Sequence, residues 1–446
     1  MPKFVRLSVV KTMKQTNRQF ILSMIMLGAL FFIFGLVSWV NSILIPYFKI
    51  ACEISQVQSY FVTFAFYIAY LVMTIPASFL LNAIGIKKGV KVGLWILSAG
   101  ALMFWPAAMT RTYSFFLIAL FTMGTALAIL QSAANPFVTI IGPRESAARR
   151  ISIVGICNKF AGIISPLVFA AAVIRPQDKE TMELVNSGAL TGAAKEQALD
   201  AMIQGVILPY VILAVVLFVF GIVFYRSSIP DVNPNKDNKT EGENVEDRKS
   251  ILSYPYLVLG VLALFCHTGS QQVSVATIID YAATMGIGLD AAKVFPSFTL
   301  ACIMVGYLFG IVTIPKYLSQ QKALVICTVT GLILSALILF VSCDVHLCGM
   351  DSDMSIWFLV LLGVPNSLIY AGIWPLAIKG LGRHTNLGSS LLVMALCGSA
   401  VVPQLYAIMA DSMGRHDAYV ILIPCFAYMI FYAVYGYRIE YWTKPK

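Results

Sequence analysis

A short polar run inside an apolar segment carries side chains that could bind a polyol. The stretch "ILQSAANPFVTIIGPRESAARR", residues 129–150, brings Gln131, Asn135 and Pro136 together. An amide offers a hydrogen-bond donor and an acceptor at once, which suits two neighbouring hydroxyl groups. Gln131 and Asn135 are four residues apart and would share one face of a helix, while Pro136 would free a backbone carbonyl in the preceding turn. These features predict an amide-bearing face for a small polar ligand.

Two later segments carry polar or aromatic residues at the spacing of one helix face, namely His267, Gln271 and Ser274, then Asn366, Tyr370 and Trp374. Phenol and indole rings offer flat apolar faces for the C–H side of a sugar ring. Contacts between membrane helices use the same polar residues, so helix packing is the alternative explanation of each stripe. The predicted substrate-binding residues, with single amides from two further helices added, are Asn41, Gln131, Asn135, Asn158, Gln271, Asn366, Tyr370 and Trp374.

One full charge lies deep in a predicted helix. Lys159 stands nine residues beyond Arg150, about 13 Å along a helix, and ionisable groups inside a membrane are functional candidates. Lys159 could carry a coupling proton, as could His267, or it could bind backbone carbonyls and amides such as Asn158; we favour the structural role. Paired carboxylates, zinc-ligand spacing and a Ser/His/Asp set are missing. We therefore predict no catalytic residue, no metal site and no cofactor, with H⁺ or Na⁺ as a possible coupling ion.

Membrane-spanning helices must position these residues. Of the 446 residues, 59% are hydrophobic and 12% are charged, against roughly 25% charged in a soluble domain. About 20 apolar residues cross the hydrocarbon core as a helix. The chain is therefore predicted to be an all-α integral membrane protein. Twelve such segments are expected, at roughly 20–46, 55–82, 90–109, 113–141, 150–174, 204–225, 255–279, 293–314, 323–341, 355–379, 387–410 and 419–437.

The basic residues indicate the orientation of the chain. It has 31 Lys and Arg against 21 Asp and Glu, a net charge of +10, and most of its Lys and Arg fall on one side if both termini are cytoplasmic. This is the positive-inside asymmetry, so a nucleic acid partner is not needed to explain the charge. The first apolar segment is too long for a cleaved signal. We expect a multi-pass protein of the inner (plasma) membrane with both termini in the cytoplasm.

The chain repeats itself. The tripeptide Thr-Ile-Pro at 74–76 recurs at 313–315, and Pro136 matches Pro375 at the same offset. Six-helix halves in parallel repeat are typical of the major facilitator fold, in which the substrate sits between the halves near the membrane midplane. The predicted segments are an N-terminal six-helix bundle at 1–225 with a long outer loop at 175–203, a cytoplasmic linker at 226–253 and a C-terminal six-helix bundle at 254–446.

Four runs of the sequence carry a family resemblance. They are "FFIFGLVSWVNSILIPYFK", "FVTFAFYIAYLVMTIPASFL", "LQSAANPFVTIIGPRESAARRISI" and "AGIWPLAIKGLGRHTNLGSSLLVM". Together they resemble the fucose/galactose/glucose symporter family of the major facilitator superfamily, and most of all its bacterial glucose/galactose branch, which includes N-acetylglucosamine carriers. The resemblance implies uptake of a neutral hexose across the bacterial inner membrane, driven by protons or, in some relatives, by sodium. It also implies that Asn158 binds the sugar and that Asn135 and Pro136 belong to the family's fourth-helix motif.

The resemblance breaks down at the family's carboxylates. The fucose permeases have Asp and Glu at the positions of Ser42 and Gln131, and the glucose/galactose branch commonly has Glu at the position of Gln271. A side chain that does not titrate cannot carry a proton. We therefore predict that hexose recognition persists without proton coupling by these residues. Facilitated diffusion, sodium coupling through amides and carbonyls, or a role for Lys159 or His267 stay open.

Other interpretations remain at this point. The chain could be a fucose or N-acetylglucosamine transporter of the same family, or a multidrug or other-solute exporter of the same fold. An anionic substrate would be expected to meet several buried cations. Twelve helices form a complete carrier alone, so we expect a functional monomer with a sugar and the lipid bilayer as its partners. Cys343 and Cys348 share a loop in which a disulfide is possible.

Overall fold

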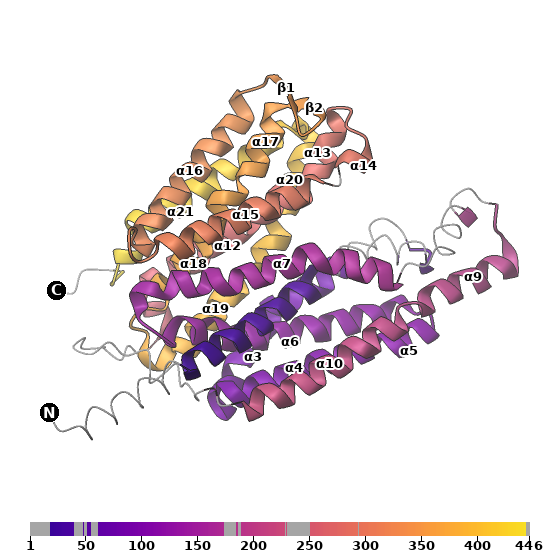
Figure 1. Cartoon of the computed structure of the whole chain (residues 1–446), viewed down its shortest axis with the longest axis horizontal. Coiled ribbons are helices and arrows are strands. Elements are labelled where there is room, and N and C mark those ends of the chain that lie inside the picture. The colour runs from indigo at the N-terminus through magenta and orange to yellow at the C-terminus, as the bar shows by residue number, and fades with distance from the viewer. Residues whose placement is uncertain are drawn as a thin grey trace.

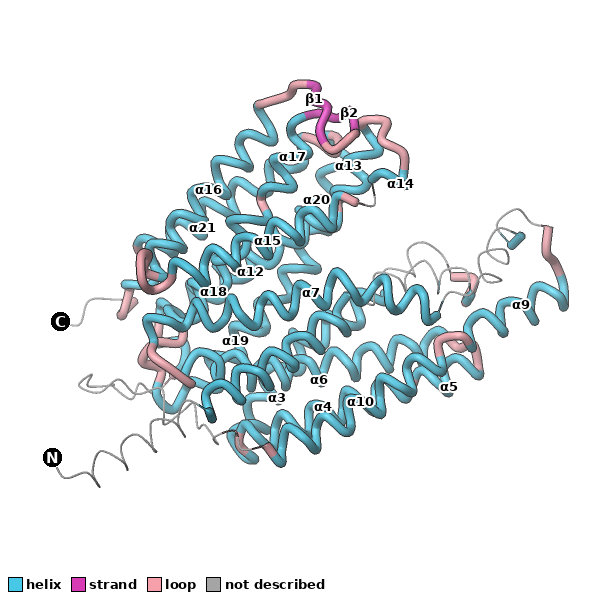
Figure 2. Tube along the Cα trace, viewed as in Figure 1, coloured by secondary structure: helices cyan, strands magenta, loops and turns pink. Residues whose placement is uncertain are grey.

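The computed structural model is a bundle of helices with one short β-hairpin (Figures 1 and 2). It describes residues 18–39, 48, 51–54, 61–173, 184–185, 189–227, 229, 250–292 and 294–442. Eleven helices within these ranges are long and apolar enough to cross a membrane, and α7 (Ala147–Val173) lies at the fifth predicted span. Each of the predicted spans therefore corresponds to a helix or to two consecutive helices.

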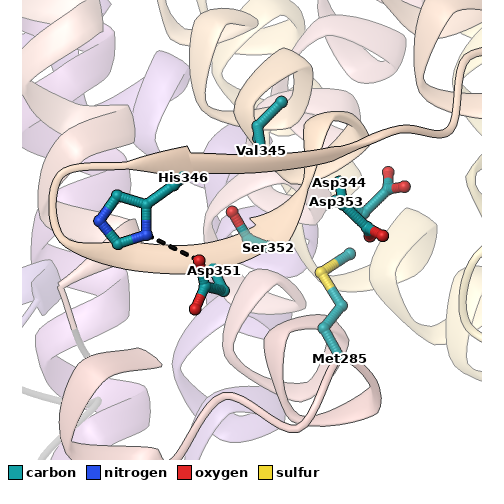
Figure 3. A pocket seen from close by; sticks show the side chains of 7 residues that line it. All are labelled: Met285, Asp344, Val345, His346, Asp351, Ser352 and Asp353. Carbon is teal, nitrogen blue, oxygen red and sulfur yellow. Dashed lines mark hydrogen bonds and ion pairs between the residues drawn. The ribbon is translucent and has the colours of Figure 1, made fainter.

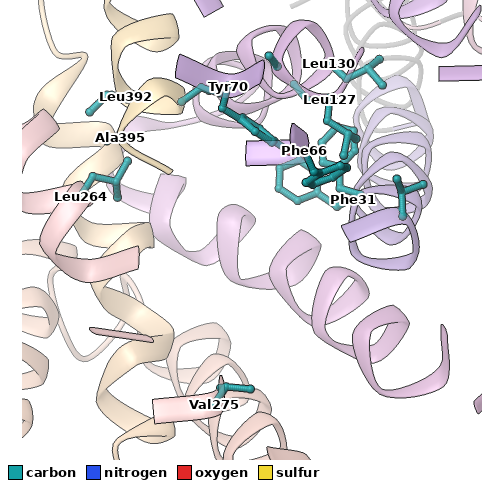
Figure 4. Packing of buried hydrophobic residues seen from close by; sticks show 14 of the residues in the cluster. Phe31, Phe66, Tyr70, Leu127, Leu130, Leu264, Val275, Leu392 and Ala395 are labelled. Carbon is teal, nitrogen blue, oxygen red and sulfur yellow. The ribbon is translucent and has the colours of Figure 1, made fainter. Parts of the chain in front are cut away.

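The first half packs around α6. Helix α6 contacts α3 and α4, and α4 contacts α10 on its other side. The helices are Arg18–Trp39, α3 (Phe61–Ile84), α4 (Ile86–Leu102), α5 (Phe104–Met109), α6 (Tyr113–Ile140), α7, α9 (Gly192–Gln204) and α10 (Ile207–Arg226). Figure 4 shows buried Phe31, Phe66, Tyr70, Leu127 and Leu130 gathered between these helices.

The second half packs around α12 and α18. Helix α12 contacts α18, α20 and α21, and α18 contacts α15 and α16. The helices are α12 (Pro255–Ala276), α13 (Ile278–Thr284), α14 (Leu289–Ala292), α15 (Phe295–Thr313), α16 (Gln320–Phe340), α17 (Met354–Leu361), α18 (Gly363–Ala377), α19 (Thr385–Met394), α20 (Gly398–Met413) and α21 (Leu422–Val434). The hairpin is β1 (Asp344–Leu347) with β2 (Met350–Asp353), and the 3₁₀ turns are η1 (Arg144–Ser146), η2 (Ile251–Ser253), η3 (Gly382–His384), η4 (Ala395–Cys397), η5 (Asp417–Ile421) and η6 (Gly436–Arg438).

The internal repeat appears in the packing of matching helices. Pro136 and Pro375 lie inside α6 and α18, and a glycine stands twelve residues before each proline, at Gly124 and Gly363. A Cβ at Gly124 would lie 2.3 Å from a backbone oxygen of α3, and one at Gly363 would lie 2.4 Å from a backbone oxygen of α15. Both pairs of helices therefore approach closely through a small residue, as membrane helices do.

The second shared motif differs between the halves. Pro76 lies inside α3, which continues to Ile84, whereas α15 ends at Thr313 and leaves Pro315 beyond its last turn. A proline ring cannot supply the backbone N–H that a continuing helix needs. The α3 segment keeps helical residues after its proline, while the chain after α15 turns at once toward α16.

The predicted outer loop at 175–203 is partly wrong, because its second part is the helix α9. Its sequence, "GAAKEQALDAMIQ", is rich in Ala, Glu, Gln, Lys and Leu, the best helix formers. Ion pairs attach α9 to the first half. Arg111 binds Glu196, lies 3.0 Å from Asp200 and 3.8 Å from Glu53, and Glu53 also pairs with Lys195.

The two ends of the bundle differ. At one end, here called the termini end, the start of the first helix lies near the α6–α7 corner, since the Phe20 ring is 3.4 Å from where a Cβ of Gly142 would be. Trp442 lies at the same end and donates to the Leu252 carbonyl at 2.7 Å. The other end carries β1, β2 and α9 and is called the hairpin end (Figure 1). The predicted linker at 226–253 lies mostly outside the described residues, so the domain boundaries stay a prediction.

Arg150 closes the corner between α6 and α7 in the motif "GPRESAARR". Its buried guanidinium donates to the carbonyls of Val138 at 2.8 Å, Thr139 at 2.6 Å and Pro143 at 2.8 Å. The last carbonyls of a helix lack partners within the helix, and Arg150 supplies donors to them. The motif therefore fixes the angle at which α7 leaves α6 and enters the space between the halves.

Candidate substrate-binding site

The predicted site residues come from α6 and α18 at equivalent positions of the repeat. Gln131 stands five residues before Pro136, and Asn135 stands one residue before it; Tyr370 and Trp374 occupy the same places relative to Pro375. One half therefore has two amides at the positions where the other has two aromatic rings. The sequence stripes predicted each helix face separately, and the shared offset shows that the two faces are counterparts.

Each amide of α6 forms a hydrogen bond with a neighbouring group of the first half. Gln131 donates to the Tyr70 hydroxyl of α3 at 2.9 Å, and Asn135 donates to the Gln131 backbone carbonyl at 3.0 Å. Asn135 is buried, while Gln131 is half-buried. Gln131 keeps its amide oxygen for another donor, because the contact with Tyr70 uses its nitrogen. The arrangement leaves the half-buried Gln131 with an amide oxygen that can accept a hydrogen bond.

The rings of α18 stack on one another. The centroids of Tyr370 and Trp374 are 5.5 Å apart with 26° between the ring planes. Trp374 is fully buried and Tyr370 is half-buried, so Tyr370 is the ring that a ligand can touch in this conformation. The Tyr370 hydroxyl lies beside the Asn135 side chain of the first half. Asn366 is fully buried one turn before, and neither of its amide atoms has a hydrogen-bond partner within the described residues.

Lys159 links the two halves. Its Nζ donates to Oε1 of Gln271 in α12 at 3.0 Å and lies 5.8 Å from the centre of the Trp39 ring. Neighbouring residues of a helix point about 100° apart. Asn158 accordingly turns toward the first helix and donates to the Phe31 carbonyl at 3.1 Å. The structural role favoured from sequence placed Lys159 with backbone carbonyls and amides such as Asn158; the hydrogen bond described here goes to an amide, that of Gln271 in the other half.

His267 lies next to this link but is enclosed. It is 1% exposed, its ring centre is 6.4 Å from that of Tyr370, and it interacts electrostatically with Lys159. Within the described residues its Nδ1 has no hydrogen-bond partner. Ser274, the third member of the predicted stripe, donates to the Gln271 carbonyl at 2.8 Å and so supports the helix rather than a ligand.

Several site residues were not found from sequence, and one predicted residue is not described. Asn41 lies outside the described residues, as does Ser42. Tyr70 and Trp39 were missed because an aromatic residue in an apolar helix is usually core or interface, and only the partner shows which face is used. The five Phe and Tyr residues in "FVTFAFYIAY" were the available signal for Tyr70.

The halves contact one another mainly toward the termini end. Asn386 in α19 donates to Oδ1 of Asn82 in α3 at 2.6 Å, and the Ala148 backbone N–H donates to Oε1 of Gln320 at 3.4 Å. The Tyr307 ring of α15 packs on Gly155 of α7, where a Cβ would lie 2.7 Å from the ring. The ribbons of the two halves diverge toward the hairpin end (Figure 1). The candidate site is therefore closed off on the side of the termini end.

A separate pocket lies at the hairpin (Figure 3). Met285 and hairpin residues including Asp344, Asp351 and Asp353 line it, and His346 Nδ1 lies 2.7 Å from Asp351 Oδ1. Within the described residues, no group of three His, Cys, Asp or Glu side chains could hold a metal ion. The pocket shares no residue with the candidate substrate-binding site.

The hairpin separates the two cysteines for which a disulfide was considered. Cys343 and Cys348 are free thiols. Asp344 pairs with Asp353 and Leu347 with Met350, so Cys343 stands at the base of the hairpin and Cys348 in the turn. Two residues separated by the length of a four-residue strand are farther apart than the roughly 7 Å limit between bridged Cα atoms.

Comparisons with known proteins agree with this architecture. The family model described as Major Facilitator Superfamily matches residues 27–403. The chain is 32% identical over 432 residues to a glucose/galactose transporter of Brucella abortus, covering 96% of each chain. It is 28% identical to the L-fucose-proton symporter of Escherichia coli (strain K12), covering 94% of this chain and 93% of that protein.

Solved structures give the same result. The crystal structure of FucP, a transporter in the outward conformation, superposes with a TM-score of 0.78 at 26% identity, over 95% of this chain and 100% of that one. A proton:xylose symporter, XylE, bound to a bromodeoxyglucose, superposes with a TM-score of 0.61 at 12% identity, over 96% of each chain. At that identity, the second match supports the fold alone.

Proposed function

Because the chain belongs to the major facilitator superfamily, we propose that it is a secondary transporter that takes up a neutral hexose, of glucose or galactose type, by alternating access. The observation that carries the proposal is the pairing of Gln131 and Asn135 in one half with Tyr370 in the other. Amides suit vicinal hydroxyls, and a half-buried ring suits the apolar side of a pyranose. The relatives named for glucose, galactose and fucose support the same substrate class.

The proposed mechanism uses the contacts between the halves. The sugar enters from the hairpin end and binds between α6 and α18, above the contact of Asn82 with Asn386. Rocking of the halves then separates the termini end and closes the hairpin end around the sugar, as in other carriers with repeated halves. The match with a structure in the outward conformation supports the assignment of the hairpin end to the outer side.

The remaining parts of the proposal concern setting and coupling. We place the chain in the inner (plasma) membrane as a functional monomer with both termini in the cytoplasm, and we assign it no enzymatic activity and no metal. Gln131 and Gln271 do not titrate, so they do not carry protons. Coupling then rests on Lys159 or His267, on Na⁺ held by amides and carbonyls, or is absent and the protein is a facilitator.

Uptake by proteoliposomes tests the function. Labelled glucose, galactose, fucose and N-acetylglucosamine are supplied with a proton gradient, a sodium gradient or none. We expect saturable uptake of glucose or galactose that Gln131→Leu reduces, because the variant removes both polar atoms of the amide. Gln272 of α12, which is half-buried and is not one of the predicted site residues, is a matched control, since Gln272→Leu makes the same change of side chain. Absence of uptake of every sugar by folded protein contradicts the proposal, and recovery of a chemically altered sugar would indicate an enzyme.

A further inference from the structure

Among the described residues, no ion pair involves Lys159. Its one hydrogen bond within the described residues goes to the neutral amide of Gln271. Its titratable neighbour is His267, which is neutral or cationic and never anionic. Lys159 is half-buried, and its Nζ lies at the boundary between the halves, on Gln271 of α12.

The sequence extends this observation to residues outside the described ranges. None of the 21 Asp and Glu residues falls inside a predicted span. The segment 40–47, which follows Trp39, reads "VNSILIPY" and contains no acid. No other part of a predicted span can therefore bring a carboxylate to Lys159.

An unpaired ammonium at this depth favours an anionic ligand. A charge that is removed from water without a counter-charge is desolvated and uncompensated. An ammonium has three donors, of which Gln271 takes one. A ligand carboxylate would supply the missing charge, and its oxygens would accept from the ammonium in place of Gln271, through charge-assisted bonds that are shorter and about twice as strong as neutral ones.

We propose that this site also binds and carries hexuronates, sugars in which C6 of the hexose is a carboxylate. The inference rests on the proposed sugar transport, because Gln131, Asn135 and Tyr370 would bind the ring shared with glucose and galactose. The carboxylate lies on Lys159 and replaces the Gln271 oxygen. A single carboxylate needs a single cation, so the sequence expectation of several buried cations applies only to substrates with more than one negative group.

The geometry also separates Lys159 from a purely structural lysine. A structural lysine would be bound to carbonyls of its own half, as Arg150 is bound to Val138, Thr139 and Pro143. Lys159 instead donates to a side chain of the other half, the amide of Gln271, which a ligand could replace. A bound carboxylate would break the link to Gln271 without leaving either group buried and unpaired, because Gln271 is half-buried.

Competition and direct uptake in proteoliposomes test this inference. Unlabelled galacturonate and glucuronate compete against labelled galactose, and labelled galacturonate uptake is measured directly, in wild type, Lys159→Gln, Lys159→Arg and Lys322→Gln. Lys322 is exposed at the start of α16 and provides the matched control for loss of one positive charge. We expect Lys159→Gln to weaken the apparent affinity for galacturonate by about tenfold or more, while the apparent affinity for galactose changes less. Lys159→Arg should keep part of the galacturonate uptake.

The outcomes distinguish the two proposals. Galactose uptake with neither competition nor uptake of hexuronates overturns the hexuronate inference and leaves the hexose transporter intact. Equal loss of both sugars in Lys159→Gln, with no selective recovery of galacturonate in Lys159→Arg, also overturns it. Failure of wild type to move any sugar contradicts the proposed function itself. Size-exclusion profiles and thermal unfolding of each variant in detergent show whether a loss of uptake follows from misfolding.

Discussion

Asn386 donates a hydrogen bond to Asn82 at 2.6 Å, and this pair of amides joins α19 of the second half to α3 of the first. Both residues lie toward the termini end, where the halves meet. The bond is between neutral groups, so added salt would not screen it as it screens a surface ion pair. Opening of the termini end has to break it.

The first prediction concerns this bond. Asn82→Ala removes the acceptor and should weaken closure of the termini end by about 1 kcal/mol, which raises the open population several-fold. Asn82→Asp keeps an acceptor and makes it charged, so it should shift the population the other way. Alkylation of a cysteine placed at Gln320, followed by peptide mass spectrometry, measures the opening. Equal alkylation rates in both variants and wild type would show that this hydrogen bond does not stabilise the closed termini end.

A second prediction concerns the tether between Lys159 and Gln271. Gln271→Glu turns a neutral hydrogen bond into an ion pair between the halves, and charge-assisted bonds contribute about 1.5–3 kcal/mol. We expect slower uptake of neutral hexose at unchanged or lower KM, because the outward state is stabilised. Gln272→Glu adds the same charge on the same helix as a control. An undiminished kcat in Gln271→Glu would separate the tether from the rate-limiting movement.

A third prediction concerns proton coupling. Gln131→Glu introduces a titratable carboxyl beside the Tyr70 hydroxyl, at a position where the wild type has an amide that cannot release a proton. Hexose uptake by this variant should become dependent on an imposed pH gradient, with accumulation above the external concentration. Uptake at several internal and external pH values provides the measurement. If the variant transports but ignores the gradient, the carboxyl at this position is not sufficient for coupling.

A fourth prediction separates the two stacked rings. Trp374 is fully buried, so Trp374→Ala should lower the free energy of unfolding by about 3–5 kcal/mol. Tyr370 is half-buried and faces Asn135, so Tyr370→Phe should leave stability nearly unchanged and raise the KM for hexose by a few-fold. Thermal unfolding in detergent and uptake kinetics of both variants check this division. If only Trp374→Ala raised the KM, the assignment of Tyr370 to sugar binding would be wrong.

A fifth prediction concerns pH and the start of α17. Partial burial alone would raise the pKa of Asp353, but hydrogen bonds from Ser342 and from the hydroxyl and backbone N–H of Ser355, with the charge of His416, hold that pKa below its usual range. The stabilisation is therefore present above the unfolded pKa of about 3.9 and is lost as pH falls through the lower folded value. Asp353→Ala should cost about 1 kcal/mol at neutral pH, as other N-caps do.

The measurement for this prediction is thermal unfolding of wild type and Asp353→Ala in detergent at neutral and strongly acidic pH. The difference between them should shrink at acidic pH, because protonated Asp353 loses its charge-assisted bonds. Asp351, exposed on the same strand β2, is the control. A difference that stays constant across the pH range would mean that the carboxylate charge does not contribute.

Sequence reasoning located the helices well because a membrane span needs a long apolar run, and that signal is strong in eleven of the twelve predicted segments. It missed α9, whose polar composition resembles a loop unless helix propensity is counted. For the site, spacing identified Gln131 and Asn135 on one face and Tyr370 and Trp374 on another. Their depth of burial could not be predicted, because neighbouring helices decide which of two stacked rings is covered.

The partners of charged and polar groups were the least predictable feature. Lys159 and Gln271 are far apart in sequence, and only the packing of α7 near α12 brings them together. Tyr70 was missed for the same reason, since its role follows from the amide that contacts it. The repeat was visible in the prolines, and the structure extends it to Gly124 and Gly363, whose packing role needs the neighbouring helix to be seen.

The equivalence of Gln131 and Asn135 with Tyr370 and Trp374 bears on the ancestry of the molecule. Two halves that arose by duplication would at first have presented identical surfaces to a cargo, and a cargo between identical surfaces could bind in either of two orientations. Divergence of one surface toward amides and the other toward rings removes that ambiguity. The substrate would then keep one edge toward each half throughout the transport cycle, and it would bind in the same orientation in every cycle.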